Sequence, residues 1–276
     1  MITLCTVTTD NNMSCLRHLL TSLANNHKDI TQILIADANI NGKSKNTTGT
    51  IYNIPYKQTV FTPINCMGNE GITEIAYAHP LGLHLCIDQA KTDYVLLVDT
   101  DVIFYQNVAH IFRNMYENHN LGIIGIEHTS DIHKQCYGNF PTVITALIHK
   151  NKLPPPDFLK GQLKYRGYLY AAEQNNIAYP HGDGKYLLPS PIQEIVHEYP
   201  NPNALFDVGC NLWYWFKNSK WLSYNKVQSG PTIYTTNHTN NFNLPPPKQV
   251  SNLLFHCGGH NNRLDILTRA SNTILI

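Results

Sequence analysis

The chain has 276 residues, of which 14% are charged, and its formal net charge is +1. A chain of this length can bury a sizeable core, either as one large α/β domain or as two small ones. The near-neutral balance and the lack of a polybasic run argue against nucleic acid as a partner and against electrostatic membrane binding. No apolar stretch of the sequence is long enough for a transmembrane helix.

The seven cysteines are scattered along the sequence, and none of them forms a Cys-x-x-Cys pair. This pattern fits reduced thiols better than a disulfide framework or a cysteine zinc site. The sequence opens on a strand pattern, without the basic and apolar regions of a signal peptide. We therefore expect a cytoplasmic protein.

Short apolar strands alternate with amphipathic helices over the first half of the sequence. Residues 2–9 are rich in β-branched side chains and predict a strand, and an apolar stripe from Met13 to Leu23 predicts the helix that follows. Residues 41–69 are polar and glycine-rich, which predicts mostly loop with a weak strand at 59–61. The alternation predicts an α/β fold with a mostly parallel, doubly wound sheet. The other expected elements are strands over 33–36, 94–98 and 121–126 and helices with Pro80 in the first turn and from about Val108.

Several of these strands end in acidic residues, namely Asp10, Asp37 and the pair Asp99 and Asp101. Ligands of open α/β sheets bind outside the carboxyl ends of the strands, so we expect these carboxylates to share one edge. Two carboxylates one residue apart repel each other unless a cation lies beside them, and Mg²⁺ and Mn²⁺ prefer oxygen ligands. Two alternatives stay open: the pair also fits a surface turn, and Asp10 fits the N-cap of the following helix.

Motifs of other nucleotide-dependent and hydrolytic enzymes are missing from the sequence. No Gly-x-Gly-x-x-Gly follows the first strand, and residues 42–44 carry only the last three letters of a P-loop. No Gly-x-Ser-x-Gly elbow occurs either. The sequence therefore argues against dinucleotide-binding, P-loop and serine hydrolase functions.

Residues 6–10, 33–37, 79–83 and 95–101 resemble the successive motifs of GT-A fold glycosyltransferases of the family-2 type. The resemblance covers most of residues 1–126, and its most specific part is the apolar strand that runs into Asp-Thr-Asp-Val. The Asn or Arg that the family usually carries after its third strand is not obvious here, which leaves the identity of the donor open.

The resemblance implies one GT-A (Rossmann-like) domain over residues 1–276, with a mixed, mostly parallel sheet flanked by helices. Residues 1–126 would bind the nucleotide sugar, and residues 127–276 would form an irregular acceptor-binding half that closes the metal site. The implied activity is metal-dependent, inverting transfer of a hexosyl or pentosyl group in glycan biosynthesis. The donor would be a UDP-, GDP- or dTDP-sugar, the acceptor a hydroxyl of a glycan or other molecule, and the ion Mn²⁺ or Mg²⁺.

The resemblance also implies roles for individual residues. Asp99 and Asp101 would bind the metal. The implied donor-binding residues are Thr8, Asp10, Asp37, His79, Asp99, Thr100 and Arg263.

A late segment supplies a candidate for a third metal ligand. Residues 251–263 predict a short apolar strand ending in His256, followed by two glycines and Arg263. By the resemblance, His256 would bind the metal, and the Arg263 guanidinium would bind diphosphate oxygens. A buried structural histidine is the alternative. Zinc bound with Cys257 and His260 is a further alternative, although no other ligand completes a four-ligand set at a familiar spacing.

Inverting transfer needs a general base that takes the proton of the acceptor hydroxyl. Asp207 lies in a segment that resembles the family's Asp-x-Gly motif, and Glu194 and Glu198 are rival candidates. An N-cap role for Asp207 is the alternative. Trp213 and Trp215 belong to an aromatic-rich region and are candidates for acceptor contact, although such side chains equally suit a core.

Two other functions remain open. A nucleotidyltransferase acting on sugar phosphates also pairs carboxylates with a divalent metal, although it normally carries a basic, glycine-rich loop near the first strand. A non-catalytic sugar-binding or scaffolding domain could keep the same fold.

Overall fold

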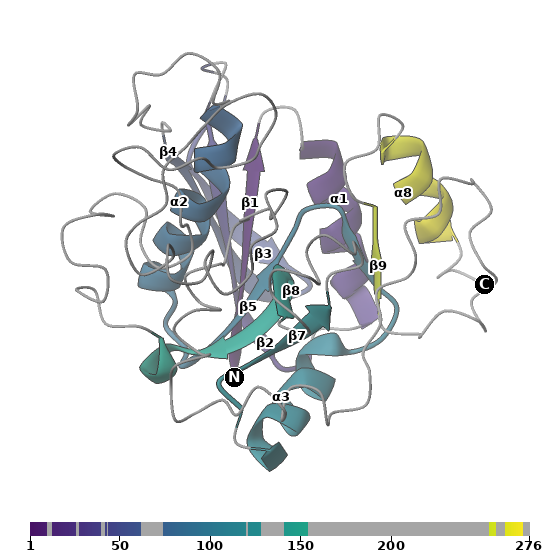
Figure 1. Ribbon diagram of the computed structural model, residues 1–276. Coiled ribbons are helices and arrows are strands. Elements are labelled where there is room, and N and C mark those ends of the chain that lie inside the picture. Colours follow the sequence, from purple (N-terminus) through teal and green to yellow (C-terminus); the bar gives the residue numbers. More distant parts are fainter. Residues whose placement is uncertain are drawn as a thin grey trace, which may run out of the picture.

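The computed structural model describes most of residues 1–153 and two short C-terminal segments. The described residues are 1–9, 13–25, 28–39, 42, 44–61, 74–119, 121–127, 141–153, 254–257 and 263–272. They form an α/β fold in which a mixed central sheet is flanked by helices (Figure 1).

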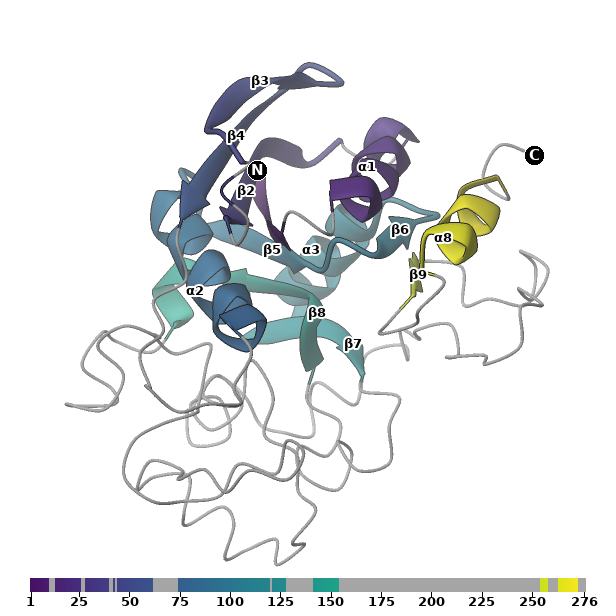
Figure 2. The same ribbon diagram turned by 90° about the horizontal axis from the view of Figure 1, so that it is seen from above.

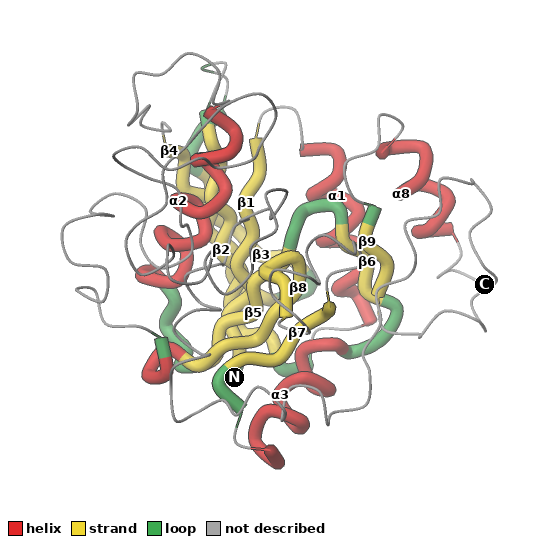
Figure 3. The backbone as a smooth tube through the Cα atoms, in the orientation of Figure 1, coloured by secondary structure: helices red, strands yellow, loops and turns green. Residues whose placement is uncertain are grey.

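The elements follow one another along the chain as a mixture of strands and helices (Figure 3). The strands are β1 (Ile2–Thr9), β2 (Ile30–Ala38), β3 (Thr47–Ile51), β4 (Ile54–Phe61), β5 (Tyr94–Val98), β6 (Val102–Phe104), β7 (Ile123–Glu127), β8 (Pro141–His149) and β9 (Leu254–His256). The α-helices are α1 (Met13–Ser22), α2 (Glu74–Gln89), α3 (Val108–His119) and α8 (Arg263–Asn272), and short 3₁₀ turns occupy Leu23–Asn25 and Lys150–Lys152.

The central sheet has seven strands in the order β3-β4-β2-β1-β5-β8-β7. β1 pairs in parallel with β2 and β5, and β2 pairs in parallel with β4, whereas β3 and β8 run antiparallel to their neighbours. Five of the seven strands therefore point the same way, which confirms the predicted mixed, mostly parallel sheet.

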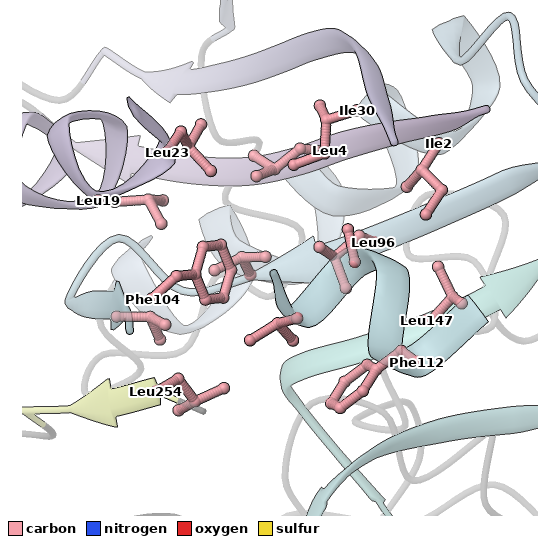
Figure 4. Close-up of a cluster of buried hydrophobic side chains, with 14 of the residues drawn as sticks. Ile2, Leu4, Leu19, Leu23, Ile30, Leu96, Phe104, Phe112, Leu147 and Leu254 are labelled. Carbon is pink, nitrogen blue, oxygen red and sulfur yellow. The ribbon is translucent and has the colours of Figure 1, made fainter. Parts of the chain in front are cut away.

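Alternating side chains of β1 divide the core into two layers. Ile2 and Leu4 belong to the cluster that also contains Leu19 of α1 and Phe112 of α3 (Figure 4). Val7 lies instead on the face covered by α2, which contacts both β1 and β2. Because successive strand residues point to opposite faces and every residue of β1 is buried, this strand is covered on both sides.

A second, two-stranded sheet pairs β6 with β9 beside the central one (Figure 2). Phe104 of β6 and Leu254 of β9 extend the large core cluster (Figure 4). A smaller cluster behind this sheet joins it to helices α1 and α8. Its buried members are Cys15, Ile103, Phe255, Cys257, Leu267 and Ala270.

The β3–β4 hairpin corrects the expectation that residues 41–69 are mostly loop. Its strands are joined by Tyr52 and Asn53, whose φ angles of 50° and 66° are those of a two-residue hairpin turn. The strands are polar because β3 is an exposed edge strand. Sequence hydropathy detects buried strands better than such an edge, and only residues 59–61 were expected to be extended.

Helix α2 begins earlier than expected, so Pro80 lies in its interior and not in its first turn. Strand β8 falls within a region expected to be irregular, and it separates β5 from β7 in the sheet. Its pairing with both neighbours is antiparallel, which local strand–helix alternation could not predict.

No helix among the described residues is long and apolar enough to cross a membrane. The four described cysteines are buried and form no disulfide. Burial and the neighbouring Cys86 raise the pKa of the Cys5 thiol well above its usual value, so this thiol stays protonated and unreactive.

Replacing Gly82 with alanine tests the contact between α2 and the sheet. A Cβ atom at this position would lie 2.7 Å from Val7 Cγ2 and 3.1 Å from Ala36 Cβ. Overpacking costs about 1–3 kcal/mol, whereas the gain in helix propensity is about 1 kcal/mol. We therefore expect Gly82→Ala to lower the free energy of unfolding in urea by about 1 kcal/mol.

The matched control is Asp88→Ala, at an exposed position of the same helix. It should leave stability within about 0.5 kcal/mol of the wild type. A stabilised Gly82→Ala variant would contradict the close packing of α2 on β1.

Candidate metal and nucleotide site

The turn after β5 holds two of the predicted site residues. The carbonyl oxygen of Asp99 accepts a hydrogen bond from the Val102 N–H at 3.3 Å, which closes a turn over Asp99 to Val102. Thr100 and Asp101 within this turn are buried. The sequence left open that Asp99 and Asp101 belong to a surface turn. The backbone does form a turn here, but Thr100 and Asp101 are buried within it.

The pairing of β6 with β9 brings His256 to this turn. Val102 and His256 are opposite each other in the antiparallel register, and the Cys257 N–H donates a hydrogen bond to the Asp101 carbonyl oxygen at 3.0 Å. His256 Nε2 consequently lies 3.3 Å from Asp101 Oδ1 and 3.8 Å from Asp99 Oδ2. The side chain of His256 is buried, with 8% of its surface exposed.

These three side chains could hold a metal ion. One ligand atom from each of Asp99, Asp101 and His256 can be chosen so that all lie within 4.8 Å of one another. Two carboxylate oxygens and one imidazole nitrogen suit Mn²⁺ or Mg²⁺ better than a soft ion. Among the described residues this is the one cluster of His, Cys, Asp and Glu with such spacing.

His79 joins the cluster from helix α2. Its Nε2 lies 3.1 Å from Asp99 Oδ1, within ion-pair distance. The same oxygen is buried but has no hydrogen bond of adequate geometry. Asp99 therefore keeps a carboxylate oxygen that a cation could satisfy.

A second buried carboxylate ends β2. The Asp37 side chain is almost completely buried, and its Oδ2 accepts a hydrogen bond from Gln58 Nε2 at 2.8 Å. Its Oδ1 is buried without a hydrogen-bond partner among the described residues. Thr8 is opposite Asp37 in the parallel register, and it is buried as well.

The strand registers place Asp37 and Asp99 at the same edge of the sheet. Cys5 of β1 is level with Leu34 on one side and with Leu97 on the other. Asp99 comes two residues after Leu97, just past the end of β5, and Asp37 comes three residues after Leu34, in the last two residues of β2. Both carboxylates therefore lie at the carboxyl ends of the two parallel strands that flank β1, where ligands of such sheets bind.

Several predicted site residues lie outside the described part of the chain. Arg263 is the first residue of α8, but its side chain is not among those described. The candidates that fall wholly outside it are Asp10, Glu194, Glu198, Asp207, Trp213 and Trp215.

Gln58 was missed as a possible site residue because its segment was expected to be loop. Three consecutive polar residues at 57–59 interrupt any alternation in β4, so the local pattern gave only the weak strand at 59–61. The contact between Gln58 and Asp37 depends on parallel pairing between strands, which no local pattern specifies.

No protein-family model matches the chain, and no curated protein matches its sequence. Solved structures do match. An active-site mutant of LgtC has a TM-score of 0.50 and 15% identity, over 99% of this chain and 96% of that one. The galactosyltransferase LgtC with donor and acceptor sugar analogs has a TM-score of 0.48 and 13% identity, over the same shares.

The glycosyltransferase GlyE of Streptococcus pneumoniae has a TM-score of 0.43 and 12% identity, over 99% of this chain and 62% of that one. At such identities, likeness concerns the fold alone. The match to the LgtC mutant supports an α/β fold of the same architecture.

Substituting His256 tests the metal cluster. His256→Ala removes one of the three candidate ligands, and we expect Mn²⁺ binding to weaken at least about tenfold, as measured by the paramagnetic resonance signal of free Mn²⁺. The control is His84→Ala, because His84 is a half-buried histidine of α2 that pairs with Asp88 and does not belong to the candidate cluster. Equal Mn²⁺ affinity in both variants and the wild type would exclude His256 as a ligand.

Proposed function

We propose that the protein is a metal-dependent glycosyltransferase that moves a hexosyl or pentosyl group from a nucleotide sugar to a hydroxyl of a glycan or other acceptor. The observation that carries this proposal is the convergence of His256 on the Asp99–Asp101 pair at the ligand-binding edge of the sheet. The donor is a UDP-, GDP- or dTDP-sugar, and the ion is Mn²⁺ or Mg²⁺.

Asp99, Asp101 and His256 would hold the ion. A divalent cation at this position supplies positive charge to a departing nucleoside diphosphate, worth several kcal/mol in the transition state. The chain's own contribution is to keep the three ligands in place. The turn fixes the two aspartates, the β6–β9 register fixes His256, and burial shields the side chains of Asp101 and His256 from bulk water.

The donor nucleoside would bind beside Asp37 and Thr8. Asp37 Oδ1 is a buried acceptor without a partner among the described residues, and a base N–H or ribose hydroxyl would satisfy it. In this proposal Asp10 also contacts the nucleoside, Thr100 and Asp99 contact the ribose, and His79 lies near the diphosphate. Arg263 would bind diphosphate oxygens.

The acceptor side of the proposal rests on the family-2 resemblance. Residues 127–276 would provide it within a single domain, with Trp213 and Trp215 against the acceptor. Asp207, or its rivals Glu194 and Glu198, would take the hydroxyl proton in an inverting reaction. The anomeric configuration of the product, read by NMR, decides between inversion and retention.

The shared fold gives independent support. LgtC, whose active-site mutant matches this chain at a TM-score of 0.50, is a galactosyltransferase whose structure is known with donor and acceptor sugar analogs. A sheet of this architecture binds its ligands at the carboxyl ends of its parallel strands, the edge at which Asp37 and Asp99 lie. A cytoplasmic setting is part of the proposal, and the reduced thiols of the four described cysteines support it.

The test is donor hydrolysis and transfer with a panel of nucleotide sugars, with Mn²⁺ present or chelated. We expect one donor to turn over only with the metal. Asp101→Ala should remain folded by circular dichroism and lose activity by at least about a hundredfold, because it removes a metal ligand. Asp88→Ala, which removes an exposed carboxylate of α2, is the control and should keep full activity.

Other results would redirect the assignment. Full activity of Asp101→Ala would refute the metal role. Preference for nucleoside triphosphates with sugar phosphates would indicate a nucleotidyltransferase. Failure to bind any nucleotide, with or without Mn²⁺, would indicate a sugar-binding or scaffolding domain.

A further inference from the structure

We infer that Gln58 is a positioning residue for the Asp37 carboxylate, and that the β3–β4 hairpin helps to set the donor affinity of the protein through it. This inference rests on the proposed function, since it concerns the nucleoside end of the same site. It assigns a role to a hairpin that lies at the far edge of the sheet, away from the metal cluster (Figure 2).

Three side chains on three neighbouring strands form a continuous row. Thr47 of β3 is directly opposite Gln58 of β4, and Gln58 is level with Ile35 of β2, two residues before Asp37. Side chains two residues apart on a strand share a face, so Gln58 reaches Asp37 along the diagonal. The row therefore runs from the exposed edge strand to the buried carboxylate.

The hydrogen bonds of this row fix the orientation of the Gln58 amide. The Thr47 hydroxyl donates to Gln58 Oε1 at 3.2 Å, and Gln58 Nε2 donates to Asp37 Oδ2 at 2.8 Å. A flipped amide would turn its oxygen toward the carboxylate and lose the hydrogen bond to Asp37, whereas the Thr47 hydroxyl could accept from the amide as well as donate to it. The carboxylate thus selects the amide orientation, and Thr47 supports that orientation from the edge strand.

The hydrogen bond from Gln58 to Asp37 Oδ2 also fixes the direction in which Asp37 Oδ1 can accept a hydrogen bond. An ionised carboxylate only accepts hydrogen bonds, and in Asp37 one oxygen is already used while the other is buried without a partner among the described residues. Because the carboxylate cannot rotate without breaking the Gln58 contact, Oδ1 keeps one direction. A ligand that supplies an N–H or O–H along that direction meets a preorganised acceptor and loses less entropy on binding.

The matched pair Gln58→Met and Lys57→Met tests this role. Methionine has nearly the length of glutamine but no donor. Lys57 is the next residue of β4 on the opposite face, and its Nζ donates to Gln89 Oε1 at the exposed surface. Binding of UDP, GDP and dTDP with Mn²⁺ is measured by calorimetry for each protein.

We expect Gln58→Met to weaken the tightest of these diphosphates about tenfold, in line with the loss of a hydrogen bond to a charged group. Lys57→Met should stay within about twofold of the wild type. The affinity of both variants for Mn²⁺ alone should be unchanged, because the metal cluster is untouched. Unchanged diphosphate affinity in Gln58→Met would overturn the inference.

A double-mutant cycle with Asp37→Ala separates positioning from a general structural effect. If Gln58 acts through Asp37, adding Gln58→Met to Asp37→Ala causes less than about a twofold further loss. A second tenfold loss in that background would overturn the inference. Thermal unfolding identifies any variant that fails to fold, and the Gln58→Met and Lys57→Met pair remains decisive without the cycle.

The wild-type titration distinguishes the two proposals. If no diphosphate binds the wild type in the presence of Mn²⁺, the proposed function fails and the role of Gln58 fails with it. If the wild type binds a diphosphate and Gln58→Met binds it equally well, only the role of Gln58 is lost.

Discussion

The antiparallel pairing of β6 with β9 is the contact on which the candidate site depends. Asp99 and Asp101 are neighbours in the chain, but His256 reaches them only because β9 aligns with Val102. Apolar side chains on the other side of this pairing, Ile103 and Phe255 among them, belong to the cluster that joins β6 and β9 to α1 and α8. The candidate metal cluster is thus held in place by hydrophobic burial behind it.

Two buried carboxylate oxygens of the site, one on Asp37 and one on Asp99, have no hydrogen bond among the described residues. Each such group costs roughly 1–3 kcal/mol in a folded protein. The two-layer core around β1 and β2 offsets this cost, since these strands are buried on both faces. A site that binds a cation and a polar ligand needs acceptor oxygens that are not already used within the protein, and these two oxygens meet that need.

Sequence periodicity predicted the buried elements well. The strand at 94–98, the short strand ending in His256 and the mostly parallel sheet all appear in the structure, because unbroken apolar runs record burial on both faces. It failed where pairing between strands decides the outcome. β3 and β4 are too polar to be recognised locally, and β8 is inserted antiparallel between β5 and β7.

In the candidate site, too, local sequence patterns predicted single residues, whereas contacts between distant segments could not be predicted. The acidic strand ends could be read from the sequence, and a late histidine could be nominated by resemblance. The contacts of His79 with Asp99 and of Gln58 with Asp37 could not, since each joins segments whose proximity is set by helix packing or strand register. Residues such as Asp207 stay predictions, because they lie outside the described part of the chain.

About 150 residues separate β6 from β9, so the ribosome completes β6 well before it begins β9. Chains leave the ribosome from the N-terminus at about 5–20 residues per second, so β1 through β8 can assemble before His256 is translated. A nascent chain would then carry both aspartates for seconds without the imidazole. Bringing together two segments so far apart in the sequence is entropically costly, so under the proposed function a divalent ion bound to the two carboxylates would favour the late docking of β9.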